Sequence, residues 1–286
     1  MDASVTIVIP ARNEANALKR LLPELRDLYP DYPIVLVDDA SSDDTRQIGL
    51  DHGANVITHP YQKGNGAAVK TGARAAKTEL IVFMDGDYQH PAAGVVQLLD
   101  RLAEGYDMVV GARGWGDQAN VARGLGNALY QRLASWMVGH TIPDLTSGFR
   151  AVRASYFRQF LNLLPNGFSY PTTITMAFFR AGYSVGFEPI NTQTREGRSH
   201  LRLVRDGIRF LLIIFRIGTL YSPLKLFAPM SLLFFATGLG YYLYTFVQFH
   251  RFTNMSALLL VTAVIVFLIG LVSEQITNLV YRDLDG

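Results

Sequence analysis

Residues 80–91 read LIVFMDGDYQHP. The first five of them are apolar, a pattern typical of a strand that is buried on both faces. The run ends in two carboxylates, Asp85 and Asp87, with Gly86 between them. Ligands of open α/β sheets bind at the carboxyl ends of strands, so the pattern places acidic chemistry at such an end. The alternative interpretation is a surface turn, because Asp-Gly is a common turn dipeptide.

The two carboxylates favour a bound cation. Asp85 and Asp87 cannot both ionise cheaply at short range without a compensating positive charge, and their oxygens suit a hard divalent ion. The side-chain carbonyl of Gln89 would add a further oxygen ligand. Gly86 has no Cβ, so a ligand is able to approach its backbone closely.

The surrounding sequence alternates between strand and helix patterns. Leucines at helical spacing predict a helix after the first strand, with Asn13 as its cap. Strands that alternate with helices indicate βαβ units, so we predict an α/β fold with a mainly parallel sheet. The expected strands cover residues 5–10, 33–37, 55–59, 80–84 and 108–112.

Composition excludes several other classes of protein. The chain of 286 residues has a formal net charge of +2, which is too small to indicate nucleic acid as a partner. It contains no cysteine, which excludes disulfides, thiolate metal sites and a cysteine nucleophile. The hydrophobic fraction is 49%, and apolar residues concentrate beyond about residue 209. The first four residues show no cleavable signal sequence.

A second acidic cluster follows the strand at residues 33–37. Asp38 and Asp39 are placed to bind a nucleobase or a ribose through charge-assisted hydrogen bonds. Helix capping is the alternative role for this acidic run. Residues 63–66 read KGNG, which fits either a phosphate cradle at a helix N-terminus or a flexible loop.

Three stretches carry a family resemblance: VIPARNE at 8–14, VDDASSDDT at 37–45 and MDGDYQHP at 84–91. In this order they resemble the motifs of family-2 glycosyltransferases with the GT-A fold. Within that family the chain is most similar to the polyprenyl-phosphate glycosyltransferases, such as dolichol-phosphate mannose synthase and the undecaprenyl-phosphate sugar transferases. The resemblance covers about the first 200 residues.

The resemblance implies a nucleotide pocket next to a metal site. Asp85, Asp87 and Gln89 would hold Mg²⁺ or Mn²⁺ on the diphosphate of a nucleotide sugar. The sequence departs from the family at Arg12, where an aromatic residue is common, and at Gly86, where alanine is usual, so the base stays open between UDP- and GDP-sugars. The residues expected to line the nucleotide pocket are Pro10, Arg12, Glu14, Val37, Asp39 and Gly86.

Arginines are expected to bind the phosphates. Arg113 ends the strand at 108–112, where its guanidinium would pair with the diphosphate or with an acceptor phosphate, as it does in the resembling enzymes. The alternative for Arg113 is a surface ion pair. Arg123 is a second candidate for acceptor-phosphate binding.

Residues 144–150 read DLTSGFR and match the acceptor end of the family's site. A phosphate-monoester acceptor is already mostly ionised at neutral pH, so it needs no general base. We therefore expect Asp144, Ser147 and Arg150 to orient groups of the site, with Ser147 at the acceptor phosphate.

Residues 194–200 read TREGRSH and resemble the acceptor loop of the family, R-x-x-G-x-S-K. We expect Arg195, Arg198, Ser199 and His200 to bind the acceptor phosphate. Arg195 is displaced by one position from the family arginine, and His200, which replaces lysine, is only partly charged near neutral pH. The alternative is a juxtamembrane basic cluster that attracts anionic headgroups.

The C-terminal part carries two long apolar stretches, residues 226–247 and 255–272. Each approaches or reaches the ~20 residues needed to span a bilayer, while a buried soluble hairpin is the alternative. Residues 201–222 mix arginines with apolar side chains and predict an interfacial amphipathic helix. We accordingly expect a GT-A catalytic domain at 1–200, the interfacial region, and a transmembrane hairpin with a short tail at 223–286.

The basic residues predict the orientation of this hairpin. Positive charge is dense at residues 195–225, whereas the connecting loop at 248–254 carries only His250 and Arg251. The positive-inside bias places the catalytic domain in the cytoplasm, at a multi-pass inner membrane protein. Two spans also leave lipid-facing surface for a homo-oligomer.

The sequence therefore predicts an inverting, metal-dependent glycosyltransferase that moves a hexose from a nucleotide sugar to a polyprenyl phosphate at the cytoplasmic face. A processive polysaccharide synthase is one alternative, but the chain lacks a Q-x-x-R-W motif and further spans. A membrane-tethered nucleotide-sugar-binding or scaffold protein without turnover is another. The complete set of Asp85, Asp87 and Gln89 argues against it.

Overall fold

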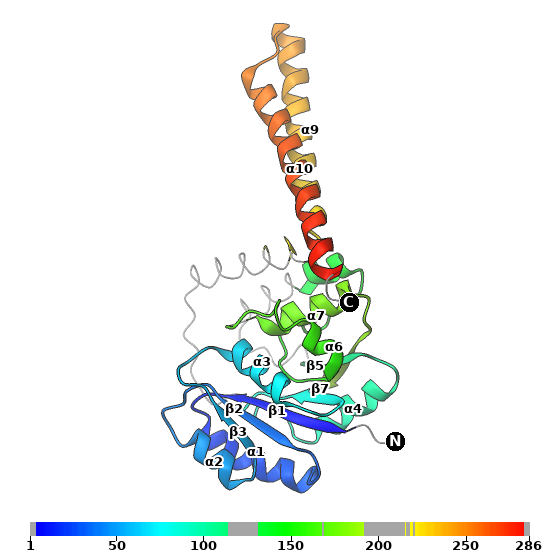
Figure 1. Ribbon diagram of the computed structural model, residues 1–286. Coiled ribbons are helices and arrows are strands. Elements are labelled where there is room, and N and C mark those ends of the chain that lie inside the picture. The colour runs from blue at the N-terminus through cyan, green and yellow to red at the C-terminus, as the bar shows by residue number, and fades with distance from the viewer. Residues whose placement is uncertain are drawn as a thin grey trace. The chain divides into compact units, whose positions relative to one another are not determined.

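The computed structural model describes residues 4–113, 131–167, 169–191, 215, 218, 219 and 221–282. The chain divides into two compact units, residues 1–200 and 201–286. The first is an α/β unit and the second contains a helical hairpin (Figure 1). Most of the expected interfacial helix at 201–222 lies outside the described residues.

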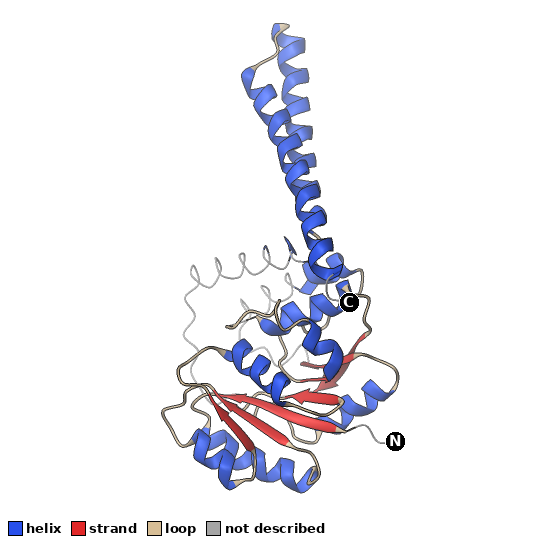
Figure 2. Cartoon of the chain, viewed as in Figure 1, coloured by secondary structure: helices blue, strands red, loops and turns tan. Residues whose placement is uncertain are grey.

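Seven strands of the described chain form one sheet, in the order β3-β2-β1-β4-β6-β5-β7 (Figure 2, red). All neighbouring pairs are parallel except those that β6 makes with β4 and β5. The mainly parallel α/β sheet predicted from the sequence is therefore confirmed. The strands are β1 (Val5–Ala11), β2 (Ile34–Asp38), β3 (Asn55–Thr58), β4 (Leu80–Phe83), β5 (Met108–Arg113), β6 (Arg150–Arg153) and β7 (Val185–Ile190).

Helices cover both faces of this sheet, because alternate side chains of a strand point to opposite faces. Ile7 and Ile9 of β1 share a core with the leucines of α1. Val8 points the other way, where α3 lies so close that a Cβ at Gly72 would collide with it. One face is covered by α1 (Ala15–Leu28), α2 (Thr45–Asp51) and α4 (Gly94–Ala103), and the other by α3 (Asn65–Ala75), α6 (Ala154–Gln159) and α7 (Tyr170–Arg180).

The antiparallel strand β6 was not predicted. Its four residues, RAVR, begin and end with arginine, so they lack the apolar run that marks a buried strand. The structure nevertheless inserts β6 between β4 and β5, where it pairs with both. Its insertion brings Arg150 into the middle of the sheet, next to the end of β4.

The predicted cap of α1 was wrong. Asn13 has a left-handed backbone with φ of 55°, and its Oδ1 accepts a hydrogen bond from the backbone N–H of Ser42 at 2.8 Å. The N–H of Ala15, at the start of α1, donates instead to Asp43 Oδ2 at 3.1 Å. The helix is thus capped from the loop after β2, which fixes the two loops to each other.

The hairpin packs through small side chains. It consists of α9 (Pro223–Phe249) and α10 (Asn254–Arg282). A seven-residue spacing of inward positions is the pattern of helices that supercoil around each other. Ser231 also donates a hydrogen bond to the carbonyl of Ala263 at 2.7 Å. The buried small residues are Ser231, Gly238 and Thr245 in α9 and Ser256, Ala263, Gly270 and Thr277 in α10.

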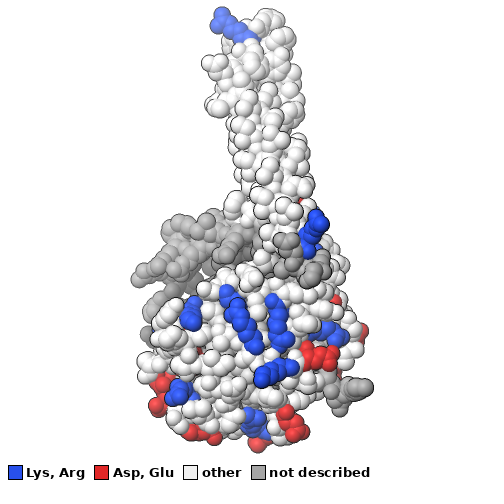
Figure 3. Space-filling model, in the orientation of Figure 1, with Lys and Arg blue, Asp and Glu red and all other residues white. Residues whose placement is uncertain are grey.

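The large apolar side chains of the hairpin face outward. By length and composition both helices are able to cross a membrane, and their most apolar windows are only 11% and 17% buried within the structure. Figure 3 shows almost no charged side chain on this hairpin, in contrast to the α/β unit. A soluble buried hairpin is disfavoured, because its apolar residues would need protein around them.

Candidate active site

Three loops with strained backbone meet at the carboxyl edge of the sheet. Asn13 follows β1, Ala40 follows β2 and Tyr88 follows β4, with φ angles of 55°, 57° and 58°. A positive φ costs energy for residues with a side chain and persists where the surrounding structure demands it, often at functional sites. β1, β2 and β4 are parallel neighbours, so this shared edge is where ligands of α/β sheets bind.

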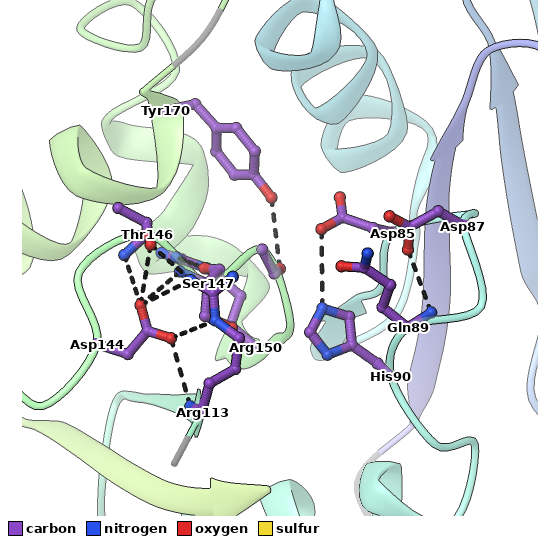
Figure 4. Close-up of polar contacts among 11 residues, drawn as sticks. Asp85, Asp87, Gln89, His90, Arg113, Asp144, Thr146, Ser147, Arg150 and Tyr170 are labelled. Atoms are coloured by element: carbon purple, nitrogen blue, oxygen red, sulfur yellow. Dashed lines mark hydrogen bonds and ion pairs between the residues drawn. The ribbon is translucent and has the colours of Figure 1, made fainter. Parts of the chain in front are cut away.

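Asp85, Asp87 and Gln89 lie together after β4 (Figure 4). The Asp85 side chain is 32% exposed, and its ion-pair partner is His90, whose Nε2 lies 3.8 Å from Oδ2. Asp87 Oδ1 accepts a hydrogen bond from the backbone N–H of Gln89 at 3.2 Å. Asp85 accepts no hydrogen bond from the described residues, so its carboxylate oxygens are accessible to a ligand.

This donor set fits a metal ion that is shared with phosphate. Among the described residues, no group of three or more His, Asp or Glu side chains could hold an ion alone. Small divalent ions are usually bound by one or two carboxylates together with substrate phosphates. Asp85 and Asp87, with the amide oxygen of Gln89, match that pattern.

Tyr88 fastens the loop that carries Asp87 to helix α1. Its hydroxyl donates a hydrogen bond to Glu24 Oε2 at 2.9 Å. The guanidinium carbon of Arg20 lies 4.3 Å from the centre of the Tyr88 ring, a favourable cation–π contact. The sequence analysis gave Tyr88 no role, because its partner Glu24 lies 64 residues earlier in the chain.

Asp39 is 4% exposed, and its carboxylate organises the loop after β3. Oδ1 lies 2.7 Å from His59 Nδ1 and accepts the N–H of Lys63 at 2.8 Å, while Oδ2 accepts the N–H of Gly64 at 2.8 Å. Burial by itself raises the pKa of Asp39, but these hydrogen bonds outweigh it and hold the pKa below its usual value. The expected contact of Asp39 with a nucleotide stays a prediction.

The KGNG stretch does not form an open phosphate cradle. The backbone N–H of Gly66 donates to the carbonyl of Gly167 at 3.3 Å, and that of Ala67 donates to Asn166 at 2.9 Å. A Cβ at Gly66 would also collide with the backbone of residue 165. The phosphate interpretation was wrong, because the start of α3 is covered by the protein's own chain.

The other expected nucleotide-pocket residues surround the same edge. Arg12 is exposed and Glu14 is partly exposed, whereas Pro10 and Val37 are buried. Gly86 is also buried, and a Cβ there would lie 3.3 Å from the carbonyl oxygen of Pro10. The absence of a Cβ at Gly86 therefore lets β1 approach the metal loop.

Arg113, at the end of β5, is held by Asp144. Its Nε lies 2.7 Å from Asp144 Oδ2 and its Nη2 lies 3.1 Å from Oδ1, while Nη2 also donates to Thr146 Oγ1 at 2.6 Å. Burial by itself raises the pKa of Asp144, but the hydrogen bond and charge of Arg113 outweigh it and lower the pKa. An ionised, paired Asp144 is suited to orienting Arg113 and not to removing a proton.

Gly148 joins the Asp144 loop to the metal loop. A Cβ at Gly148 would lie 2.5 Å from Asp85 Oδ2, so the two loops are in contact at this point. Tyr170 donates a hydrogen bond to the Gly148 carbonyl at 3.4 Å (Figure 4). The neighbouring Ser147 hydroxyl is buried and has no hydrogen-bond partner among the described residues, which suits it to a ligand.

Five expected acceptor-binding residues lie outside the described part of the chain. They are Arg123, Arg195, Arg198, Ser199 and His200.

Two family models match the chain. The model of Glycosyl transferase family 2 matches residues 6–161, which include all strands from β1 to β6, apart from the start of β1, and both acidic strand ends. The chain belongs to glycosyl transferase family 2. A second model, the GtrB C-terminal hairpin, matches residues 222–279 of this glycosyltransferase and so covers the small-residue seam of α9 and α10.

Curated relatives of this glycosyltransferase act on lipid-linked phosphates by name. Glycosyltransferase AglJ of Haloferax volcanii is 29% identical over 248 residues, which cover 84% of this chain and 80% of the relative. A dolichyl-phosphate hexose transferase of the same organism is 30% identical, over 69% of this chain and 86% of the relative. An undecaprenyl-phosphate mannosyltransferase of Micrococcus luteus is 29% identical, over 67% and 84%.

Solved structures confirm the GT-A fold. Glucosyl-3-phosphoglycerate synthase of Mycobacterium tuberculosis with phosphoglyceric acid superimposes with a TM-score of 0.62 at 19% identity, over 76% of this chain and 79% of that one. A complex of the same enzyme with Mn²⁺, UDP and phosphoglyceric acid gives a TM-score of 0.62 at 20% identity, over 76% and 78%. At these identities the likeness establishes the fold alone.

Proposed function

We propose that this glycosyltransferase transfers a hexose from a UDP- or GDP-sugar to a polyprenyl phosphate, with inversion at the anomeric carbon and dependence on a divalent metal. The observation that carries the proposal is the contact of two loops at Gly148. One loop presents the carboxylate of Asp85, and the other presents Ser147 and the Arg113–Asp144 pair. Cation-binding and phosphate-binding groups are thereby placed side by side.

The donor diphosphate would bind at the metal loop. Asp85, Asp87 and Gln89 would hold Mg²⁺ or Mn²⁺, which would stabilise the charge that develops on the departing diphosphate. Manganese and UDP are present in the solved complex of the glucosyl-3-phosphoglycerate synthase, which supports this choice of ligands. Arg12, Glu14 and the loop shaped by Asp39 would surround the nucleotide.

The acceptor phosphate would bind at the Arg113 loop. The bidentate contact with Asp144 fixes the Arg113 guanidinium, so its orientation is set before substrate arrives. The acceptor oxygen is already anionic at neutral pH and attacks without a general base. Attack from the face opposite the diphosphate inverts the anomeric centre and gives a β-linked product from an α-linked donor.

The hairpin would anchor the enzyme where its lipid substrate resides. We assign residues 1–200 to the catalytic domain, 201–222 to the interfacial region and 223–286 to the membrane hairpin. The relatives named for dolichyl and undecaprenyl phosphates support a lipid acceptor. The basic segment at 195–225 supports a cytoplasmic catalytic domain, and the outward apolar side chains leave surface for self-association.

A donor panel tests this function. Purified full-length protein in detergent would be given polyprenyl phosphate, Mn²⁺ or Mg²⁺, and one UDP- or GDP-sugar at a time. We expect release of nucleoside diphosphate with one donor class, and only when both lipid and metal are present. Tight nucleotide-sugar binding without release from any donor would overturn the proposal and favour a tethered binding protein.

A further inference from the structure

Arg150 is a fully buried arginine behind the site. It begins β6 and is 0% exposed. A buried charge is costly unless an opposite charge compensates it. Among the described residues, no carboxylate forms an ion pair with Arg150, whereas Arg153 at the other end of the same strand pairs with two.

The groups that touch Arg150 are neutral. Its Nη2 donates to the carbonyl of Ser147. Its Nη1 donates to the carbonyl of Pro171 and to the hydroxyl of Thr175, each at 3.3 Å. Its Nε has no partner in the described part of the chain. These contacts satisfy several N–H groups and leave the positive charge without a neutralising partner.

Two carboxylates act on Arg150 from a greater distance. Burial lowers the pKa of Arg150, while Tyr170, Asp85 and Asp144 raise it in that order. Asp144 is already neutralised by Arg113 at 2.7 Å, whereas Asp85 has only the His90 ring at 3.8 Å. Asp85 is therefore the carboxylate whose charge is left to balance that of Arg150.

Contacts also connect the two residues mechanically. Arg150 holds the carbonyl of Ser147, and the next residue, Gly148, lies directly against the carboxylate of Asp85. Figure 4 shows Arg150 and Asp85 on opposite sides of this turn. Any movement of the Arg150 guanidinium would consequently be transmitted through a single peptide unit to Asp85.

We propose that Arg150 is a positioning residue, whose buried charge keeps Asp85 ionised and seated against Gly148 when no metal is bound. A bound cation would share the negative charge of Asp85 with Arg150. Arg150 would therefore preform the site at the expense of metal affinity, which would allow the metal–diphosphate product to leave. The inference rests on the proposed function only in assigning the metal to Asp85.

A double-mutant cycle in EDTA tests the charge coupling without any metal. The intact protein in detergent would carry Arg150→Met, Asp85→Asn or both, and its Tm would be measured. We expect each single change to lower Tm, and the double change to lower it by roughly 5 °C less than the sum. The matched control is Arg153→Met with Asp107→Asn, a partly exposed pair at 3.8 Å that should show additive losses.

A metal titration provides the second readout. Because a cation replaces the compensation that Arg150 gives, Mn²⁺ should raise the Tm of Arg150→Met by more than it raises that of the wild type. Arg150→Lys retains the charge but not the planar fork, so its increment should return toward the wild-type value. If Arg150→Met does not fold, Arg150→Gln takes its place in both experiments.

Additive Tm losses in EDTA, together with an unchanged Mn²⁺ increment, would overturn the proposal and leave Arg150 a packing residue. A wild-type protein that shows no Mn²⁺ increment would instead contradict the metal in the proposed function. The cycle in EDTA decides the coupling of Arg150 and Asp85 in either case, so the two failures are distinguishable.

Discussion

The guanidinium of Arg113 grips the carboxylate of Asp144 through two nitrogens, with Nε 2.7 Å from Oδ2 and Nη2 3.1 Å from Oδ1. Asp144 is 3% exposed, whereas the Arg113 side chain is 35% exposed. The pair is therefore anchored on its acidic side and open on its basic side. This arrangement presents an oriented cation at the end of β5.

Asp144→Asn tests the orienting role. The amide keeps the size of the side chain but loses the charge that fixes Arg113, so we expect kcat to fall by roughly 10²-fold. Steady-state transfer rates with saturating donor would measure this loss. Asp100→Asn, at an exposed position of α4, is the matched control and should retain its rate. Full activity of Asp144→Asn would show that Arg113 needs no such partner.

The same ion pair predicts a pH dependence of stability. The pKa of Asp144 is lowered from 3.8, so its contribution is fully present above pH 3.8 and is lost as the pH falls through the lower, folded-state pKa. We expect Asp144→Asn to lose about 2 kcal/mol of stability at neutral pH. Denaturant midpoints should show a constant difference from about pH 8 to 5 that shrinks below about pH 4. A difference that already shrinks between these upper values would contradict the lowered pKa.

Gly148→Ala should damage the metal site without removing a ligand. The new Cβ would lie 2.5 Å from Asp85 Oδ2, so the carboxylate must move. We expect Mn²⁺ affinity, measured by calorimetry in the presence of nucleoside diphosphate, to fall by at least about 10-fold. Gly167→Ala is the control, because a Cβ there meets no atom within 4 Å. Equal affinities of the two variants would show that Asp85 is not a ligand or that the loop is free to yield.

The hairpin seam predicts a contrast between two glycines. A Cβ at Gly270 would lie 2.8 Å from the Cβ of Phe227, whereas one at Gly240 meets no atom within 4 Å. Gly270→Leu should therefore separate α9 from α10 and lower the Tm of the detergent-solubilised protein, while Gly240→Leu should leave it unchanged. Close approach through small residues is what holds helices together in lipid, where no hydrophobic driving force acts between them. Similar Tm values for both variants would mean that the seam contributes little.

Local sequence patterns were sufficient for the strands and for the metal loop. The apolar run at 80–84 marks a buried strand by itself, and two carboxylates directly after it mark the ligand-binding edge. The spacing of apolar residues at 226–247 and 255–272 likewise predicted both long helices. In each case the signal lies within one element, so no knowledge of tertiary contacts is needed.

Contacts between distant segments were beyond such patterns. His59 reaches Asp39 across 20 residues, and Tyr88 reaches Glu24 across 64. Asn13 has the side chain of a helix cap but bonds to Ser42 of another loop. Arg150 looks like a surface residue in sequence, and only the antiparallel insertion of β6 buries it. These roles depend on which segments the fold brings together.

The most direct test of the central claim compares the wild type with Asp87→Ala in one lipid-transfer assay. A radiolabelled donor sugar, identified by the panel, would be incubated with polyprenyl phosphate and Mn²⁺, and the organic phase counted. We expect label in the lipid with the wild type, and none with EDTA or with folded Asp87→Ala. Equal transfer by Asp87→Ala, or undiminished transfer in EDTA, would contradict a metal-dependent glycosyltransferase at this site.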